Sequence, residues 1–295
     1  MKVGICGMGR MGAAIAQRLL SVGHEVHVWN RDAQKTQPLV GLGAHKAATP
    51  ADLATASDVI ITMLFNDQAI DAVLRGPNGV LSVPITGKIV IEMSTVLPEV
   101  EEAAARDVRA QGGLYIECPV GGTVGPARDG KLLGLVGGRD GDVVQAMPLL
   151  EQMCRRVEHV GEVGAGAKMK LAVNLPLLVY WQALGEALSL CAPLGLPAER
   201  VIDILSDTSG TPTAMKGRGA DIAKLLAGHP TGAPAFDVGA AKKDLVTMSS
   251  FAKQLHVDVP VVDAAIRSYE EVEAQGLQAA DPINVPVYWS RRGKK

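Results

Sequence analysis

The sequence predicts an α/β N-terminal domain with a doubly wound, mostly parallel sheet, followed by an all-α C-terminal domain. Its length of 295 residues exceeds what one hydrophobic core usually serves. In the first half, short β-like runs alternate with helical runs, as in βαβ units. After about Val160 the strand pattern stops and helical patterns follow. We therefore place two domains at residues 1–162 and 163–295, with the boundary in the glycine-rich segment 161–166.

The expected strands are short, apolar and separated by Gly-rich turns. They lie at residues 2–6, 25–29, 58–64, 88–93, 114–118 and 132–136. A helix is expected at 11–22, and the C-terminal helices at 165–194, 198–206, 214–226, 240–255 and 260–274. The most apolar stretch, from Leu171 to Leu196, is interrupted by polar residues and prolines, so we expect a buried helix and not a membrane span.

The composition is that of a globular protein, with 47% hydrophobic and 20% charged residues. The formal net charge is −2 and no long basic run occurs, which argues against nucleic acid or a membrane surface as a partner. The short basic segment from Arg291 to Lys295 is interpreted as a solvated tail.

The cysteines indicate a reducing compartment. Cys6, Cys118, Cys154 and Cys191 are far apart, and none belongs to a CxxC pair or a zinc-ligand spacing, so we expect no metal site. The strand pattern begins at the first residues and leaves no room for a signal peptide. We therefore expect a cytoplasmic protein.

A GxGxxG motif stands between the first strand and the first helix. It comprises Gly7, Met8, Gly9, Arg10, Met11 and Gly12. The first glycine allows a tight turn, the second lets the backbone approach a pyrophosphate, and the third lets helix and strand pack closely. The free N–H groups and the dipole of the helix N-terminus then favour the phosphates. This context predicts a Rossmann-type dinucleotide site formed by all six residues.

The residues that follow the second strand indicate whether the cofactor is NAD(H) or NADP(H). An NAD enzyme usually places Asp or Glu there for the ribose 2′-hydroxyl, but this chain has Asn30 followed by Arg31. Arg31 can pair with a 2′-phosphate, which a carboxylate would repel. Asp32 lies one or two residues later and could turn inwards. We expect NADP(H) as the preferred cofactor, with NAD(H) as the alternative.

Six motifs in order give the chain a family resemblance. They are the box at residues 7–12, Ile61-Thr62-Met63-Leu64, Met93-Ser94-Thr95-Val96-Leu97-Pro98, Pro119-Val120-Gly121-Gly122-Thr123, the segment 164–174 (GAGAKMKLAVN) and Lys243-Asp244-Leu245. Together they make the chain similar to the β-hydroxyacid dehydrogenases, the 3-hydroxyisobutyrate dehydrogenase-like family. The resemblance covers nearly the whole chain and is nearest to the NADPH-dependent glyoxylate and succinic semialdehyde reductases of that family.

The resemblance implies that Lys170 is the catalytic proton donor and that Asn174 holds the substrate hydroxyl or the lysine. Four residues separate the two, so they share one helix face. The neighbouring residues are apolar, and burying a lysine ammonium among them costs free energy unless it has a partner or a function. Lys168 is the competing candidate, and we expect it to face elsewhere on the helix.

The same resemblance implies further site residues. Ser94 and Thr95 would lie beside the nicotinamide, and Met63 and Leu64 would line the path from the adenine ribose to the pyrophosphate. Lys243 would lie near the cofactor or the substrate. The substrate-binding positions would be Gly121, Gly122 and Thr123.

Three residues depart from the family pattern. Gly121 replaces the usual serine of the substrate loop, Phe65 replaces a proline, and Pro176 is expected to kink the catalytic helix. Thr123 could supply the missing hydroxyl, or the backbone N–H groups of Gly121 and Gly122 could bind an anion.

The expected function is hydride transfer between NADPH and a small aldehyde or β-hydroxyacid-type substrate with an acidic tail. The alternatives are an imine reductase-like enzyme and a nucleotide-binding sensor without turnover. The family resemblance also implies a homo-oligomer, a dimer or a tetramer.

Overall fold

A computed structural model describes residues 1–208, 210 and 212–292 of the chain. The chain forms two compact units, Met1–Leu171 and Ala172–Lys295. The dividing point falls inside one long helix, α8 (Ala165–Cys191), so that Lys170 belongs to the first unit and Asn174 to the second.

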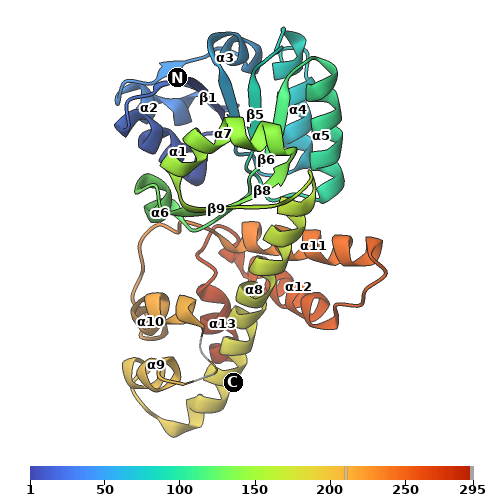
Figure 1. Ribbon diagram of the computed structural model, residues 1–295. Coiled ribbons are helices and arrows are strands. Elements are labelled where there is room, and N and C mark those ends of the chain that lie inside the picture. Colours follow the sequence, from blue (N-terminus) through green and yellow to red (C-terminus); the bar gives the residue numbers. More distant parts are fainter. Residues whose placement is uncertain (209, 211, 293–295) are drawn as a thin grey trace. The chain divides into compact units, whose positions relative to one another are not determined.

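The first unit is built on one sheet (Figure 1). Its strands are β1 (Lys2–Cys6), β2 (Glu25–Trp29), β3 (His45–Lys46), β4 (Val59–Thr62), β5 (Ile89–Glu92), β6 (Leu114–Glu117), β7 (Val120–Gly121), β8 (Leu132–Gly138) and β9 (Cys154–Gly161). Fully buried runs such as Val59–Thr62 are typical of parallel strands that are covered on both faces.

The order of the strands is that of a doubly wound dinucleotide-binding sheet. The first six are parallel in the order β3-β2-β1-β4-β5-β6. Strand β8 then runs antiparallel to β6 and β7, and β9 pairs with β8 in parallel. The order reverses between β1 and β4, and ligands of such sheets bind at this switch point, outside the carboxyl ends of the strands. The expected fold class is confirmed.

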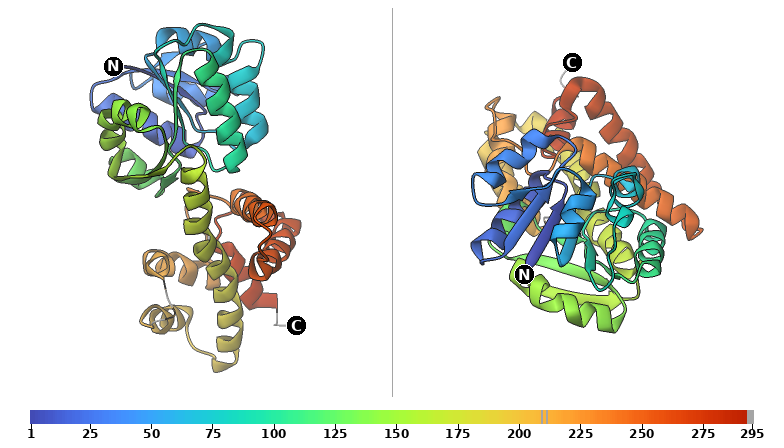
Figure 2. Two further views of the ribbon diagram at one scale, coloured as in Figure 1. Left: turned by 45° about the vertical axis from the view of Figure 1, so that its right-hand side comes forward. Right: turned by 90° about the horizontal axis from the view of Figure 1, so that it is seen from above.

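Helices cover both faces of the sheet, with α4 and α5 opposite α1 and α7 (Figure 2). The bounds of the helices are α1 (Arg10–Ser21), α2 (Gln37–Val40), α3 (Pro50–Ala56), α4 (Asp67–Arg75), α5 (Pro98–Ala110), α6 (Val124–Arg128) and α7 (Asp140–Met153), with short 3₁₀ turns at Ala33–Thr36 and Val80–Ser82. One core layer joins α1, α6 and α7 to the sheet, and the other joins α3, α4 and α5.

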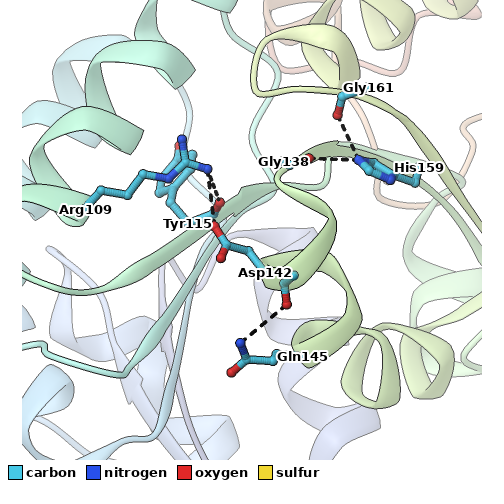
Figure 3. Close-up of polar contacts among 8 residues, drawn as sticks. Arg109, Tyr115, Gly138, Asp142, Gln145, His159 and Gly161 are labelled. Atoms are coloured by element: carbon cyan, nitrogen blue, oxygen red, sulfur yellow. Dashed lines mark hydrogen bonds and ion pairs between the residues drawn. The ribbon is translucent and has the colours of Figure 1, made fainter.

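Polar contacts connect helix α5 to strand β6 and helix α7, and strand β9 to strand β8 (Figure 3). Arg109 on α5 donates to the backbone oxygen of Tyr115 and to the Asp142 carboxylate on α7, both at 3.3 Å. The His159 ring on β9 lies 2.9 Å from the backbone oxygen of Gly138 and 3.0 Å from that of Gly161. The His159 contacts hold β9, the strand that leads into α8, against the end of β8.

The second unit is helical. Besides the rest of α8 it contains α9 (Ala198–Ser206), α10 (Thr213–Leu226), α11 (Val238–Gln254), α12 (Pro260–Val272) and α13 (Asn284–Arg292), with a 3₁₀ turn at Ala192–Leu194 and a π-helical turn at Glu273–Leu277. The Tyr269 hydroxyl of α12 donates to the backbone oxygen of Leu178 at 3.1 Å, and Arg218 pairs with Asp281 at 2.6 Å. Both contacts tie this unit together internally.

The expectation of a buried apolar helix needs correction. Within the described chain, the helical stretch Ala165–Leu194 is long and apolar enough to cross a membrane by length and composition, with a mean hydropathy of 1.3. Only 33% of the most apolar 18-residue window of this stretch is buried. One such helix is weak evidence for a membrane span, because core helices meet the same criteria. Helix α8 continues through Pro176, whose ring removes one backbone hydrogen bond.

Candidate functional site

The Gly-rich loop has the geometry that its sequence predicts. Gly7 has φ +105°, and a Cβ there would lie 2.2 Å from the backbone oxygen of Met63. A Cβ on Gly12 would lie 1.9 Å from the backbone oxygen of Gly7. Gly9, in contrast, faces open space, because a Cβ at this position would have no described atom within 4 Å. Two glycines are thus required by close packing, and the third leaves the backbone accessible to a pyrophosphate.

The start of α1 suits an anion. Gly9 is its N-cap and supplies no side-chain hydrogen bond, and the first turn carries no acidic residue. At any helix start, the first-turn N–H groups have no carbonyl partner within the helix itself. A dinucleotide pyrophosphate therefore fits this end of the helix, where charge and hydrogen-bond donors both favour it.

Asn30 shapes the loop from the neighbouring strand end. Its Oδ1 accepts from the backbone N–H of Met8 at 2.9 Å, and its Nδ2 donates to the backbone oxygen of Asp32 at 2.9 Å. The backbone N–H of Gly7 also donates to the oxygen of Trp29 at 2.9 Å. Asn30 therefore connects the phosphate loop to the segment that would face the adenosine ribose.

Arg31 is exposed and makes no hydrogen bond or ion pair with the part of the chain that the structure describes. The Asp32 carboxylate has a local partner, because it accepts from the backbone N–H of Gln34 at 3.1 Å and caps the following turn. The guanidinium is therefore available to a phosphate, whereas the neighbouring carboxylate is engaged in local structure.

At the carboxyl ends of β4 and β5, a buried glutamate organises the backbone. Glu92 accepts from the Thr62 hydroxyl at 2.5 Å and from the Ser94 N–H at 2.6 Å. The Ser94 hydroxyl then accepts from the N–H of Leu64 at 2.8 Å. Burial raises the pKa of Glu92 to about 7, and the hydrogen bonds from Ser94 and Thr62 act in the opposite direction. This network connects the segments that directly follow the two strands, in which Leu64 and Ser94 lie.

The remaining predicted residues at this edge are less buried. Met63 and Thr95 are half-buried, next to Thr62 and Ser94, and Phe65 is 58% exposed. Phe65, which stands where the family pattern has a proline, is therefore at an accessible position.

The predicted substrate loop, Pro119–Thr123, follows β6 and contains β7. Gly122 has φ +126°, and a Cβ there would lie 2.9 Å from the Leu132 Cδ2. Gly121 differs, because its Cβ would meet only Leu133 at 3.5 Å, an ordinary contact. Thr123 is exposed, and its hydroxyl bonds to none of the described residues. The loop thus offers an accessible hydroxyl and one glycine position that accepts a side chain.

The two candidate lysines of α8 differ in exposure. Lys170 is 9% exposed, whereas Lys168 is exposed. Their neighbours differ in the same way. Met169, next to Lys168, is 41% exposed, and Leu171, next to Lys170, is 3% exposed. The expected separation of Lys168 and Lys170 onto different faces of the helix is confirmed.

Glu117 was not among the residues singled out from the sequence. It ends β6, is fully buried, and accepts three backbone N–H groups from the start of α8. The donors are Gly164 at 2.5 Å, Gly166 at 2.9 Å and Ala167 at 3.0 Å. Burial raises the pKa of Glu117 to about 7, while these three bonds and the charge of Lys168 act in the opposite direction.

Asp244 is a second residue whose part was not foreseen. Its carboxylate accepts from Asn174 Nδ2 at 3.2 Å and lies 2.7 Å from Lys243 Nζ. Asp244 is 3% exposed, so it orients both groups from within the helical unit. The neighbouring Lys242 forms an ion pair with Glu273 and so has a structural partner.

Comparison with known proteins identifies the family. Residues 2–161 match the NAD-binding domain of 6-phosphogluconate dehydrogenase, and residues 164–286 match the domain described as NAD-binding of NADP-dependent 3-hydroxyisobutyrate dehydrogenase. The chain belongs to the β-hydroxyacid dehydrogenase family. It is therefore an NAD(P)-dependent oxidoreductase, and the domain matches favour NADP(H).

The β-hydroxyacid dehydrogenases most similar to it include two curated enzymes. Glyoxylate/succinic semialdehyde reductase 1 of Arabidopsis thaliana is 33% identical, over 95% of this chain and 96% of the relative. The 3-sulfolactaldehyde reductase of Escherichia coli K12 is 34% identical, over 95% of this chain and 92% of the relative. A solved structure of Psf3 in complex with NADP+ and 2-OPP is 28% identical, with a TM-score of 0.85 over 97% of this chain and 99% of that one.

A likeness to imine reductases also exists, at the level of the fold. The Streptomyces aurantiacus imine reductase has a TM-score of 0.63 and is 24% identical, over 98% of this chain and 99% of that one. The hydroxyacid dehydrogenase assignment fits better, because relatives of that group match at higher identity over nearly the whole chain.

Proposed function

We propose that this β-hydroxyacid dehydrogenase reduces a small aldehyde carrying an acidic group to the corresponding hydroxyacid, with NADPH as hydride donor and Lys170 as proton donor. The observation that carries the proposal is the position of Lys170. This lysine is almost buried on α8, one helical turn before Asn174, whose amide is held by Asp244.

The buried position suits proton donation. A positioned ammonium that is largely shielded from bulk water can transfer its proton directly to a bound carbonyl oxygen. When bound, the nicotinamide supplies the hydride for the carbonyl carbon. Lys170 would hydrogen-bond the carbonyl oxygen and give it a proton as negative charge develops there. Asn174 would hold the substrate hydroxyl or orient the lysine.

The cofactor contacts follow from the first unit. The N–H groups at the start of α1 would bind the pyrophosphate, with Asn30 shaping the loop around Gly9. Arg31 would pair with the 2′-phosphate that distinguishes NADPH from NADH. Met63, Leu64 and Thr95 would line the cofactor path within the first unit. Lys243, which Asp244 holds at 2.7 Å, would contact the cofactor or the substrate.

The substrate loop supports an acidic substrate. The exposed Thr123 hydroxyl and the backbone of Gly121 and Gly122 would bind the acid group. The two curated relatives act on a carboxylate-bearing and a sulfonate-bearing aldehyde by their names, so either anion is a candidate here. A nucleotide-binding sensor without turnover is disfavoured by the presence of both Lys170 and Asn174.

A homo-oligomer is part of the proposal, as is a cytoplasmic location. Large apolar side chains are exposed in the second unit, among them Leu190 at 83% and Leu194 at 63%, and self-association would cover such side chains. The location is supported by the four cysteines, because all of them are free thiols, as expected in a reducing compartment.

The proposal is tested by following NADPH oxidation, through the loss of the near-ultraviolet absorbance that only the reduced cofactor has, with a panel of aldehydes. The panel should contain carboxylate, sulfonate and uncharged aldehydes of matched length, and a ketone with an amine for imine reduction. We expect turnover of the charged aldehydes and little of the uncharged ones. Turnover confined to the ketone–amine pair would instead establish the imine reductase alternative.

A further inference from the structure

Glu117 connects two parts of the first unit that are far apart in sequence. It ends β6, directly before the segment that leads to the substrate loop Gly121–Thr123. Its two carboxylate oxygens accept N–H groups of Gly164, Gly166 and Ala167, at the start of α8. One side chain therefore fixes the beginning of the helix that carries Lys170 to the strand that carries the substrate loop.

Two glycines make room for this carboxylate. Gly137 is the cross-strand partner of Glu117, and a Cβ on Gly137 would lie 2.1 Å from Glu117 Oε1. A Cβ on Gly166 would lie 3.2 Å from Glu117 Cδ and 2.5 Å from the backbone oxygen of Leu135. The glutamate thus fills a space that strand β8 and helix α8 both leave open, so its position is closely defined.

The contacts are placed so that they set the position of the helix, because three N–H groups at its start converge on one side chain. A carboxylate bonded to N–H groups at a helix start gains from charge-assisted hydrogen bonds and from the helix dipole. Lys170 follows Ala167 by three residues and therefore lies within one turn of the bonded segment. A displacement of the first turn would move the Lys170 ammonium with it.

We propose that Glu117 is a positioning residue of this enzyme, which holds Lys170 in register with the substrate loop through the first turn of α8. The inference rests on the proposed role of Lys170 as proton donor. It does not require Glu117 to touch the substrate or the cofactor.

The test is a double-mutant cycle of Glu117→Gln and Lys170→Ala, with kcat, KM and the NADPH dissociation constant measured for each protein. The glutamine keeps the size of the side chain but presents an amide N–H₂ towards one of the three donors. A misplacement of about 1 Å costs up to about 100-fold in rate, so we expect kcat of Glu117→Gln to fall about 10- to 100-fold. NADPH affinity should stay at the wild-type value. In the Lys170→Ala background, the second substitution should change kcat by less than about twofold, because the group that Glu117 positions is gone.

Glu101→Gln is the matched control. Glu101 is equally buried and accepts from the Tyr115 hydroxyl at 2.6 Å, but the N–H groups of α8 bond to Glu117. This control should change thermal stability and leave kcat within about twofold of the wild type. If Glu117→Gln fails to fold, Glu117→Asp, which withdraws the charge by one methylene group, takes its place in the cycle.

The outcomes separate the two claims. Wild-type kcat in Glu117→Gln, or an equal loss in the presence and absence of Lys170, would overturn the positioning role and leave the function of Lys170 intact. Wild-type kcat in Lys170→Ala would overturn the proposed function itself.

Discussion

At the scale of single residues, three charged side chains have distinct environments. Arg31 is exposed and available, Glu92 is buried between two strand ends, and Lys170 is nearly buried on α8. The exposure of each decides which measurement reports on it. Affinity reports on Arg31, the pH dependence of stability on Glu92, and turnover on Lys170.

Arg31→Ala should weaken NADPH binding. Loss of one charge-assisted contact to the 2′-phosphate is expected to raise the NADPH dissociation constant roughly 10- to 150-fold. NADH lacks this phosphate, so its dissociation constant in the same variant is the internal control and should be unchanged. Fluorescence titration measures both, and an unaltered NADPH value would remove Arg31 from the cofactor site.

Glu92 should make stability depend on pH. Its pKa is about 7 in the folded protein and 4.5 ordinarily, so between these values the folded state binds more protons than the unfolded state. The contribution of Glu92 to the free energy of unfolding is therefore largest below pH 4.5, declines as pH rises to about 7, and is constant above that.

Glu92→Gln removes this titration and keeps a side chain able to bond Thr62 and Ser94. Relative to the wild type, the variant should gain roughly 3 kcal/mol between pH 4.5 and pH 7, from a pKa shift of this size. Urea unfolding of both proteins at several pH values measures the difference. A difference that stays constant across this range would show that Glu92 titrates normally.

At the scale of elements, the substrate loop contains two glycines that are not equivalent. A side chain at Gly122 would combine a φ of +126° with a close contact to Leu132, so Gly122→Val should destabilise the protein as well as raise KM. A change in the KM of Gly122→Val is therefore not a clean measure of substrate contact. Gly121 is the better position, because a Cβ fits there.

Gly121→Ser restores the residue that the family pattern has at this point. We expect an unchanged melting temperature and a lower KM for the acidic aldehyde that turns over best, since a hydroxyl is added near the proposed anion site. Differential scanning fluorimetry and steady-state kinetics test this, with Thr123→Val as the opposite change, which should raise KM. Equal KM values in all three proteins would place the acid group elsewhere.

The sequence predicted most elements for reasons that the structure makes visible. Buried parallel strands such as Val59–Thr62 are continuous apolar runs, and α12 begins at Pro260, where a proline is favourable. Strand β9 was not predicted, because its sequence CRRVEHVG is half-exposed and charged. Helix α13 was not predicted either, because its sequence NVPVYWSRR is short and contains Pro286.

The site was predictable only where a motif is local. The residues of the Gly-rich loop and the Lys170–Asn174 spacing can be read within a few positions. The partners of these residues cannot, because Glu117 is 47 residues from Gly164 and Asn174 is 70 residues from Asp244. A carboxylate at the end of a buried strand was the available signal for Glu117, and the fold was needed to find its partner.

At the scale of the whole molecule, the apolar helical unit raises the question of assembly. Leu190→Glu should shift a homo-oligomer towards the monomer of 30.8 kDa, because it places a charge among side chains that association would bury. Val144→Glu is the matched control, since Val144 is 70% exposed but lies on α7 of the first unit. Light scattering after size exclusion gives the masses. A wild-type mass of one chain would contradict the proposed oligomer.

The central claim is that Lys170 donates the proton during NADPH-dependent aldehyde reduction, and its most direct test is the single-turnover rate of Lys170→Ala beside that of Lys168→Ala. Proton transfer from a positioned side chain contributes about 10²–10⁴-fold, so Lys170→Ala should lose about this factor with NADPH binding intact. Lys168→Ala, an exposed lysine two residues earlier on the same helix, should react at nearly the wild-type rate. A Lys170→Ala enzyme that retains more than about a tenth of the wild-type rate would contradict the account.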